Sequence, residues 1–138
     1  MKMTNTTEPS AYQYYLGIMS GTSLDGIDVA LVSISKDNKT TFLAGEEFPF
    51  DNDLREKVLT LCETQNTSLQ NLGEITAELS LAYAKAVNLF LKNQNITASQ
   101  IIAIGCHGQT VFHQPTGNSA FSMQLVDAAK IAANTNIT

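Results

Sequence analysis

Small, hydroxylated and acidic residues are concentrated between positions 17 and 28, in the run Gly-Ile-Met-Ser-Gly-Thr-Ser-Leu-Asp-Gly-Ile-Asp. Gly21 and Gly26 allow backbone N–H groups to approach an anion closely, because glycine has no side chain to obstruct it. The hydroxyls of the neighbouring threonine and serine add hydrogen-bond donors to phosphate oxygens. We therefore expect a loop for the terminal phosphates of a nucleoside triphosphate at residues 20–28, called the phosphate loop below. Its expected phosphate-binding residues are Gly21, Thr22, Ser23, Leu24, Asp25, Gly26, Ile27 and Asp28.

The two carboxylates of the phosphate loop have a different expected role. A carboxylate repels phosphate, whereas Mg²⁺ prefers oxygen ligands and keeps several waters, so Asp25 and Asp28 are predicted to hold Mg²⁺ directly or through water. Gly21 and Gly26 have the glycine spacing of a Walker loop. The Lys and Ser or Thr that a Walker loop requires are replaced by Ile27 and Asp28, which excludes a P-loop.

The phosphate loop is flanked by segments with strand character. Aromatic and β-branched residues precede it at about 14–20, and apolar residues alternate with polar ones at about 27–35, which predicts an antiparallel hairpin. Asp25-Gly26 is a turn signal, since Gly accepts a positive φ. The same composition is also typical of an ordinary tight turn that binds nothing, and on the residues alone this alternative stays open.

A second polar motif follows a continuous apolar run at residues 101–104. Such a run is typical of a strand buried on both faces, and open α/β folds bind ligands at the carboxyl ends of their strands. His107, Gln109 and Thr110 follow this run, and polar side chains beside a flexible Gly offer the donors and acceptors that suit a sugar. The structural alternative is that Gly108 only turns the chain and His107 supports its neighbours.

Two other chemistries are excluded for this second motif. Cys106 and His107 are neighbours on an extended chain and point to opposite faces, so they do not pair as nucleophile and base. A zinc site with His113 as third ligand lacks a fourth ligand and the usual ligand spacing. Cys62 and Cys106 are instead expected to be free thiols that are mostly buried.

Residues 16–28 and 104–115 together resemble the anhydro-N-acetylmuramic acid kinases of bacterial cell-wall recycling. These kinases are members of the sugar kinase, actin and Hsp70 superfamily. A third run, residues 123–127, is also similar, although Val126 stands where the family usually has Gly. The resemblance covers essentially all of residues 15–138.

The resemblance implies a fold and its ligands. The fold is α/β, a ribonuclease-H-like half-domain with a mixed sheet and flanking helices at residues 13–138. The polar composition of residues 1–12 separately predicts a disordered lead-in. The first hairpin loop faces the phosphates of ATP, and residues 104–115 face the anhydrosugar, with His107, Gln109 and Thr110 as the expected substrate-binding residues. ATP and Mg²⁺ are the implied cofactors, and Asp25 and Asp28 remain the residues expected to hold the metal.

The resemblance also implies a reaction. A carboxylate activates water to open the 1,6-anhydro ring of anhydro-N-acetylmuramic acid, while the freed O6 takes the γ-phosphoryl group of ATP, giving N-acetylmuramic acid 6-phosphate in peptidoglycan recycling. The family's catalytic Asp lies soon after the position that matches Thr138. The chain is therefore expected to be an amino-terminal fragment of a longer kinase and to be inactive alone. A homodimer of the full-length kinase is compatible with the resemblance. The alternatives are a kinase of another sugar, a non-catalytic actin- or Hsp70-like nucleotide-binding module, and a fragment that binds neither ligand alone.

The composition excludes other classes of partner. The chain has 8 basic and 13 acidic side chains and a net charge of −5, and its basic residues do not cluster, so nucleic acid is not an expected partner. No apolar stretch has the length of a signal-peptide core or a membrane span. We therefore expect a cytoplasmic protein with no membrane partner.

The remaining patterns predict the elements that position the two motifs. A third strand is expected at about 40–48, and Asp53 with Glu56 predicts a capping box for a short helix that ends near Thr64. A longer helix is expected to open at Thr67 and to bury one face. That face consists of Leu69, Leu72, Ile75, Leu79, Ala82, Ala86 and Phe90.

The last third of the chain is expected to contain two short strands and a helix. The strands lie at about 110–113 and 119–125, separated by a turn at 114–118. Asp127 precedes an apolar helical run at 128–134, so it is predicted to cap that helix, with a contact in the ligand cleft as its alternative role.

Overall fold

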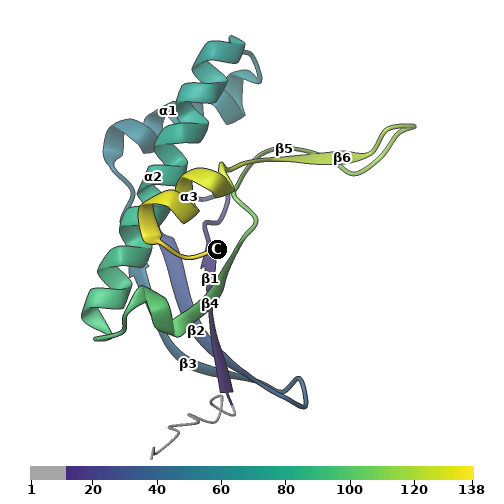
Figure 1. Ribbon diagram of the computed structural model, residues 1–138. Coiled ribbons are helices and arrows are strands. Elements are labelled where there is room, and N and C mark those ends of the chain that lie inside the picture. Colours follow the sequence, from purple (N-terminus) through teal and green to yellow (C-terminus); the bar gives the residue numbers. More distant parts are fainter. Residues whose placement is uncertain (1–11) are drawn as a thin grey trace, which may run out of the picture.

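The computed structural model describes residues 12–138, which form a four-stranded sheet, a separate two-stranded sheet and three α-helices (Figure 1). In chain order the elements are β1 (Tyr12–Met19), β2 (Ile27–Ser35), β3 (Thr40–Phe48), α1 (Asn52–Thr64), α2 (Leu69–Asn93), a 3₁₀ turn (Ala98–Gln100), β4 (Ile101–Cys106), β5 (Gln109–Gln114), β6 (Phe121–Leu125) and α3 (Ala128–Thr135). The expected disordered lead-in lies outside the described residues, apart from Tyr12, which instead begins β1.

The main sheet has the strand order β3-β2-β1-β4. The first three strands form an antiparallel meander, in which Met19 pairs with Asp28 and Ile27 pairs with Phe48. β4 runs parallel to β1, with Leu16 opposite Ile104, and α1 and α2 make the long crossover that a parallel neighbour requires. The predicted mixed α/β sheet and its three-stranded start are therefore confirmed.

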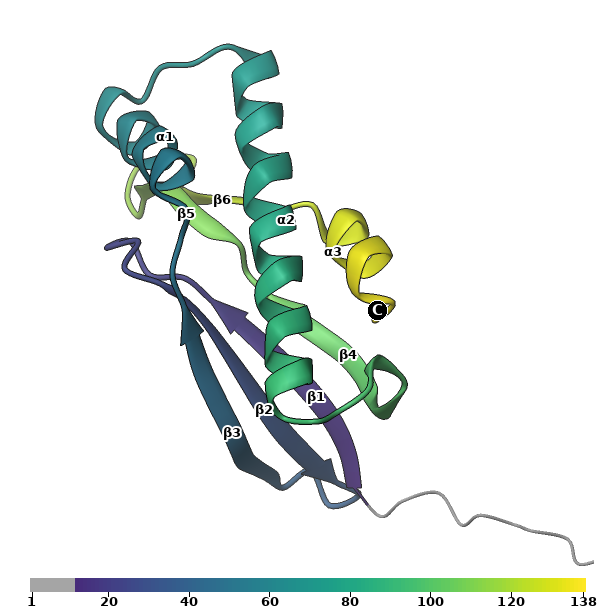
Figure 2. The same cartoon turned by 90° about the vertical axis from the view of Figure 1, so that its left-hand side faces the viewer.

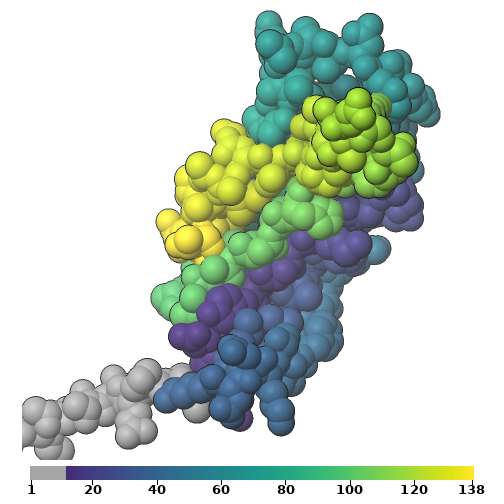
Figure 3. Space-filling model, turned by 90° about the vertical axis from the view of Figure 1, so that its right-hand side faces the viewer, coloured from purple at the N-terminus to yellow at the C-terminus, as the bar shows by residue number. Residues whose placement is uncertain are grey.

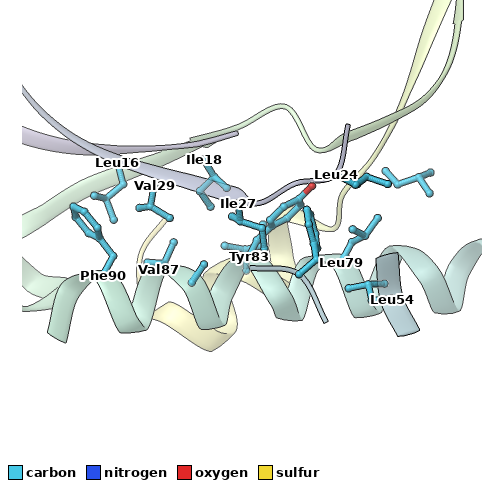
Figure 4. Close-up of a cluster of buried hydrophobic side chains, with 14 of the residues drawn as sticks. Leu16, Ile18, Leu24, Ile27, Val29, Leu54, Leu79, Tyr83, Val87 and Phe90 are labelled. Carbon is cyan, nitrogen blue, oxygen red and sulfur yellow. The ribbon is translucent and has the colours of Figure 1, made fainter. Parts of the chain in front are cut away.

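The hydrophobic core lies between this sheet and α2, which crosses one face of it (Figure 2). Alternate residues of β2 are buried, as the alternating pattern predicts. Figure 4 shows strand side chains, among them Leu16 and Val29, directed at side chains of α2 such as Val87 and Phe90. Burying each such side chain stabilises the fold by roughly 1.5–3 kcal/mol, so the core fixes α2 on the sheet.

The helices begin at residues other than those predicted. α1 is capped by Asp51, whose Oδ1 accepts the N–H groups of Asp53 at 3.0 Å and Leu54 at 3.4 Å, so the box expected at Asp53 was wrong. Ser68 caps α2 by accepting the N–H of Asn71 at 3.0 Å, one residue after the predicted Thr67. Both segments contain several adjacent residues able to cap, and the packing of the helix selects among them.

The buried face of α2 matches the prediction along most of its length but not at its start. Leu69 was expected in the core and is 88% exposed, because the first turn of α2 extends beyond the sheet (Figure 2). Tyr83 and Val87, which the expected stripe omitted, are fully buried and lie over β1 and β2 (Figure 4).

The expectation that residues 101–104 are buried on both faces was wrong. β4 is an edge strand of the described sheet, and Ile102 is 51% exposed. The face opposite α2 shows the strands themselves at the surface (Figure 3), so side chains that point that way are not covered. Continuous apolar runs therefore do not distinguish one covered face from two.

The last third of the chain forms a hairpin and a helix, as predicted. β5 and β6 pair as an antiparallel hairpin that projects from the body of the molecule (Figure 1), with Phe112 stacked on Phe121 at a ring distance of 5.5 Å. Asp127 caps α3 by accepting the Lys130 N–H at 3.0 Å, which confirms the predicted cap. Within residues 12–138, none of the helices has the length and apolar character needed to span a membrane.

Candidate functional site

The phosphate loop connects β1 to β2 and turns over Leu24. The Leu24 N–H donates to the Gly21 carbonyl at 3.1 Å, which closes a turn. Leu24 has a φ of 54°, a left-handed conformation that is unfavourable for a residue with a side chain, and its side chain is only 1% exposed. The turn signal at Asp25-Gly26 therefore marked the right segment, but the positive φ falls on Leu24 and not on Gly26. Burial of the leucine side chain holds the backbone in this strained form.

Apart from Ser20, the polar side chains of the phosphate loop face outward. Thr22, Ser23, Asp25 and Asp28 are exposed, whereas Leu24 and Ile27 are buried. The loop thus presents hydroxyls and carboxylates to solvent while two apolar side chains anchor it. This arrangement suits a ligand that approaches from outside the sheet and needs hydrogen-bond donors and metal-binding oxygens.

A buried polar cluster lies beneath the phosphate loop. The hydroxyl of Ser20, the residue after β1, is 2.7 Å from the Tyr83 hydroxyl of α2 and 2.7 Å from Gln109 Oε1 at the start of β5. Ser20 is 3% exposed, and Tyr83 and Gln109 are 0% exposed. Three elements that are distant in sequence therefore meet at one hydroxyl. Tyr83 carried no functional signal in the sequence, because it belongs to neither motif and lies outside the apolar face expected for the helix.

Gln109 connects the two motifs of the sequence through hydrogen bonds. Its Nε2 donates to the Gly21 carbonyl and to the Thr110 carbonyl, each at 3.3 Å. The direct sugar contact expected of Gln109 stays a prediction, since in this structure its amide groups are directed into the protein. Through Gln109, the structure does join the 107–110 segment to the phosphate loop.

The other predicted substrate residues are more accessible. His107 is exposed, and Thr110 is half-buried with its Oγ1 accepting from Gln124 Nε2 at 3.3 Å. Gly108 between them has a φ of 76°, and a Cβ at this position would lie 2.6 Å from the Leu125 carbonyl oxygen. Only glycine fits here, so Gly108 sets the path of the chain and leaves His107 at the surface.

Two charged side chains from other elements flank the phosphate loop. Arg55 of α1 donates from Nε to the Leu24 carbonyl at 3.1 Å. Glu47 of β3 pairs with Asp28 in the sheet and lies over Gly26, where a Cβ would be 2.5 Å from its Cγ. Arg55 places a permanent positive charge beside a loop expected to bind phosphate. Neither residue was marked by a motif, because each meets the loop only through the fold.

The carboxylates of the phosphate loop suit Mg²⁺ better than a metal that needs several protein ligands. No group of three or more His, Cys, Asp or Glu side chains in residues 12–138 is arranged to hold an ion. Asp25 and Asp28 are exposed carboxylates on the phosphate loop. Mg²⁺ is commonly held by one or two carboxylates together with water and substrate phosphates, so two exposed carboxylates fit it by chemistry, and their role as its ligands stays a prediction.

Burial shifts the ionisation of two groups near the cluster. Desolvation raises the pKa of the Tyr83 hydroxyl to about 12, although its hydrogen bond with Ser20 lowers the pKa in part. Burial also raises the pKa of the Cys106 thiol, against a smaller lowering by the Gly108 backbone. Both groups are neutral at physiological pH, and Cys62 and Cys106 are free thiols that are half-buried.

Asp127 is held by its capping role. Its N–H donates to Ser80 Oγ of α2 at 2.8 Å, while its Oδ1 receives the Lys130 N–H at 3.0 Å. The substitution of Val126 for the family's usual Gly does not prevent this cap.

A meander that packs on a crossover helix, with a polar loop after its first strand and a second polar segment after the parallel strand, defines the half-domain of an actin-like sugar kinase. The family model described as anhydro-N-acetylmuramic acid kinase matches residues 13–138. The chain therefore belongs to the anhydro-N-acetylmuramic acid kinase family, as its two motifs indicated.

Curated relatives agree with this family. The chain is 50% identical over 126 residues to the anhydro-N-acetylmuramic acid kinase of Haemophilus influenzae, a match that covers 91% of this chain and 32% of the relative. Proteins of the same name from Vibrio cholerae and Mannheimia succiniciproducens are 47% and 45% identical over 91% of the chain, which correspond to 34% and 33% of their own lengths. The chain thus spans about a third of the length of the curated relatives it matches.

Proposed function

We propose that this chain supplies the ATP-phosphate loop and part of the sugar-binding cleft of an anhydro-N-acetylmuramic acid kinase. The observation that carries this proposal is the direct hydrogen bond between Ser20 and Gln109, which joins the two motifs of a chain that the family model matches over residues 13–138. A turn that binds nothing does not require a hydrogen bond to a polar segment on another strand.

In the proposed reaction, water adds to C1 of the anhydrosugar as the C1–O6 bond breaks, and O6 takes the γ-phosphoryl group of ATP. ADP leaves, and the product is N-acetylmuramic acid 6-phosphate, an intermediate of peptidoglycan recycling. A carboxylate outside the 138 residues accepts the proton of the attacking water. Because ATP is the proposed phosphoryl donor, we propose that the activity is cytoplasmic.

The residues of this chain bind and orient the reactants. The N–H groups and hydroxyls of residues 21–23 hold phosphate oxygens, and Arg55 adds positive charge beside them. Asp25 and Asp28 would hold Mg²⁺, which neutralises charge on the phosphates when it is bound. His107 and Thr110 contact the sugar, and Gln109 lies buried between them and the phosphate loop.

The direct test is a kinase assay on the full-length protein with anhydro-N-acetylmuramic acid and ATP in ¹⁸O-labelled water. We expect equimolar ADP and sugar phosphate, with one labelled oxygen at C1. Phosphorylation without ring opening, or turnover only with other sugars, would contradict the substrate. Robust turnover by the 138-residue chain alone would contradict a base supplied from outside it.

The metal role of the phosphate loop has a matched control. Asp25→Asn and Asp28→Asn should each lower kcat/KM for MgATP by more than about tenfold, because each removes a charged ligand. Asp37→Asn removes an exposed carboxylate from the turn between β2 and β3 and should leave kcat/KM unchanged. Equal effects of all three substitutions would assign the loss to net charge rather than to the site.

A further inference from the structure

The hydrogen bonds at Ser20 have a single consistent direction. Gln109 Oε1 is a carbonyl oxygen and only accepts, so the Ser20 hydroxyl donates its one proton to it at 2.7 Å. Tyr83 then donates to Ser20 Oγ at 2.7 Å. The reverse orientation of the Gln109 amide would place Oε1 against the carbonyl oxygens of Gly21 and Thr110, leaving acceptors facing acceptors.

The resulting chain of hydrogen bonds runs from α2 into the turn of the phosphate loop. It passes from Tyr83 to Ser20, from Ser20 to Gln109, and from Gln109 to the Gly21 carbonyl. That carbonyl also accepts the Leu24 N–H that closes the turn. Every buried polar side-chain atom of the described residues has a hydrogen-bond partner, so breaking one bond of this chain leaves an unpaired group in the interior.

We propose that Tyr83, Ser20 and Gln109 are positioning residues that fix the phosphate loop against the His107–Thr110 segment, so that bound ATP and bound sugar are held in register. This inference rests on the proposed function for the identity of the two ligands. The side chains need not touch either ligand. Phosphoryl transfer depends on placing the acceptor oxygen in line with the γ-phosphate, and small displacements of the loop are costly to the rate.

The first test measures the loop without any ligand. In the 138-residue chain, Ser20→Ala and Tyr83→Phe should raise amide hydrogen exchange in residues 20–28 roughly tenfold, as expected for loss of a buried hydrogen bond. The control is Thr135→Val, which removes a hydroxyl that is 2% exposed and donates to the Ile131 carbonyl at 2.9 Å in α3. This control should leave exchange in the loop unchanged, and equal exchange in all variants would overturn the proposal.

The second test separates positioning from stability in the full-length protein. Partial unfolding removes active enzyme, which lowers apparent kcat and leaves KM for ATP unchanged. Ser20→Ala and Tyr83→Phe should instead raise KM for ATP and lower kcat/KM roughly tenfold, with Thr135→Val within twofold of the native protein. The double variant Ser20→Ala with Tyr83→Phe should be at most about threefold worse than the worse single variant, because both break one chain of bonds.

The outcomes distinguish this inference from the proposed function. If the full-length protein does not act on the anhydrosugar, the proposed function fails, and loop exchange still decides whether the buried chain orders the loop. If the protein is active but KM for ATP is unchanged in both single variants, the three residues are structural only and the positioning role is overturned. Fully multiplicative effects in the double variant would also overturn a single connected chain.

Discussion

Replacing Tyr83 by phenylalanine tests the buried cluster through stability as well as through kinetics. The substitution removes one hydroxyl from a side chain that is 0% exposed and keeps the ring in the core. Ser20 still donates to Gln109, so only one hydrogen bond is lost. At neutral pH we expect the free energy of unfolding to fall by about 1 kcal/mol, the usual contribution of such a bond.

The sign of this difference should reverse at high pH. The unfolded chain releases the phenolic proton near pH 10, and the folded chain retains it to about 12, so between these values the unfolded state binds fewer protons. The contribution of Tyr83 is therefore fully present below pH 10 and is lost as pH rises toward 12, at about 1.4 kcal/mol per pH unit. A deficit of about 1 kcal/mol for Tyr83→Phe should vanish near pH 11 and then become an advantage.

The measurement is urea unfolding of the native chain and of Tyr83→Phe at several values between pH 7 and pH 11.5, followed by circular dichroism. The difference between the two proteins removes contributions from the other titrating groups, because these are common to both. A difference that stays constant or widens with pH would refute the reasoning, since the buried hydroxyl would then ionise as easily in the folded chain as in the unfolded one.

Three further predictions concern the loop and its surroundings. Leu24→Ala should lower the free energy of unfolding by about 2–5 kcal/mol in chemical denaturation. Leu24→Gly should be less destabilising than Leu24→Ala by up to about 1 kcal/mol, because glycine adopts a positive φ without strain. A glycine variant less stable than the alanine variant would contradict the strained turn. Cys106 should react with a thiol reagent at neutral pH much more slowly in the folded chain than in urea, since burial raises its pKa, and equal rates would argue against that burial. Asp51→Ala should cost about 1 kcal/mol in thermal unfolding, whereas Asp53→Ala, which removes the predicted cap, should cost less.

Local patterns predicted the elements of this fold well. The alternation of Ile27, Val29 and Leu31 predicted a strand with one buried face, and the polar residue before an apolar run predicted the Asp127 cap. These signals depend on neighbours in the sequence, so they can be identified without the tertiary structure. Burial at the ends of elements cannot be identified in this way. Leu69 and Ile102 were wrongly expected to be buried because the extent of the layer that covers them is not a local property.

The candidate site was predictable only in part. The glycines, hydroxyls and carboxylates of the phosphate loop stand out by type and spacing, and the second motif follows a recognisable apolar strand. The contacts of Tyr83, Arg55 and Glu47 with the loop region arise from the packing of α2, α1 and β3 around it. The positive φ of Leu24 is also a tertiary effect, since a buried leucine is held where glycine would be chosen on local grounds.

The bonds that anchor Ser20 also determine when the phosphate loop can acquire its final form. Its partners lie 63 and 89 residues further along the chain, so the loop is synthesised before the residues that bond to it. Closing such long loops costs entropy before any contact is gained, and non-local contacts of this kind slow folding. The β1–β2 hairpin can form early from its own turn, while the final geometry of the phosphate loop waits for β5. The phosphate loop thus reaches its final form late in folding, on a strand pair that forms early.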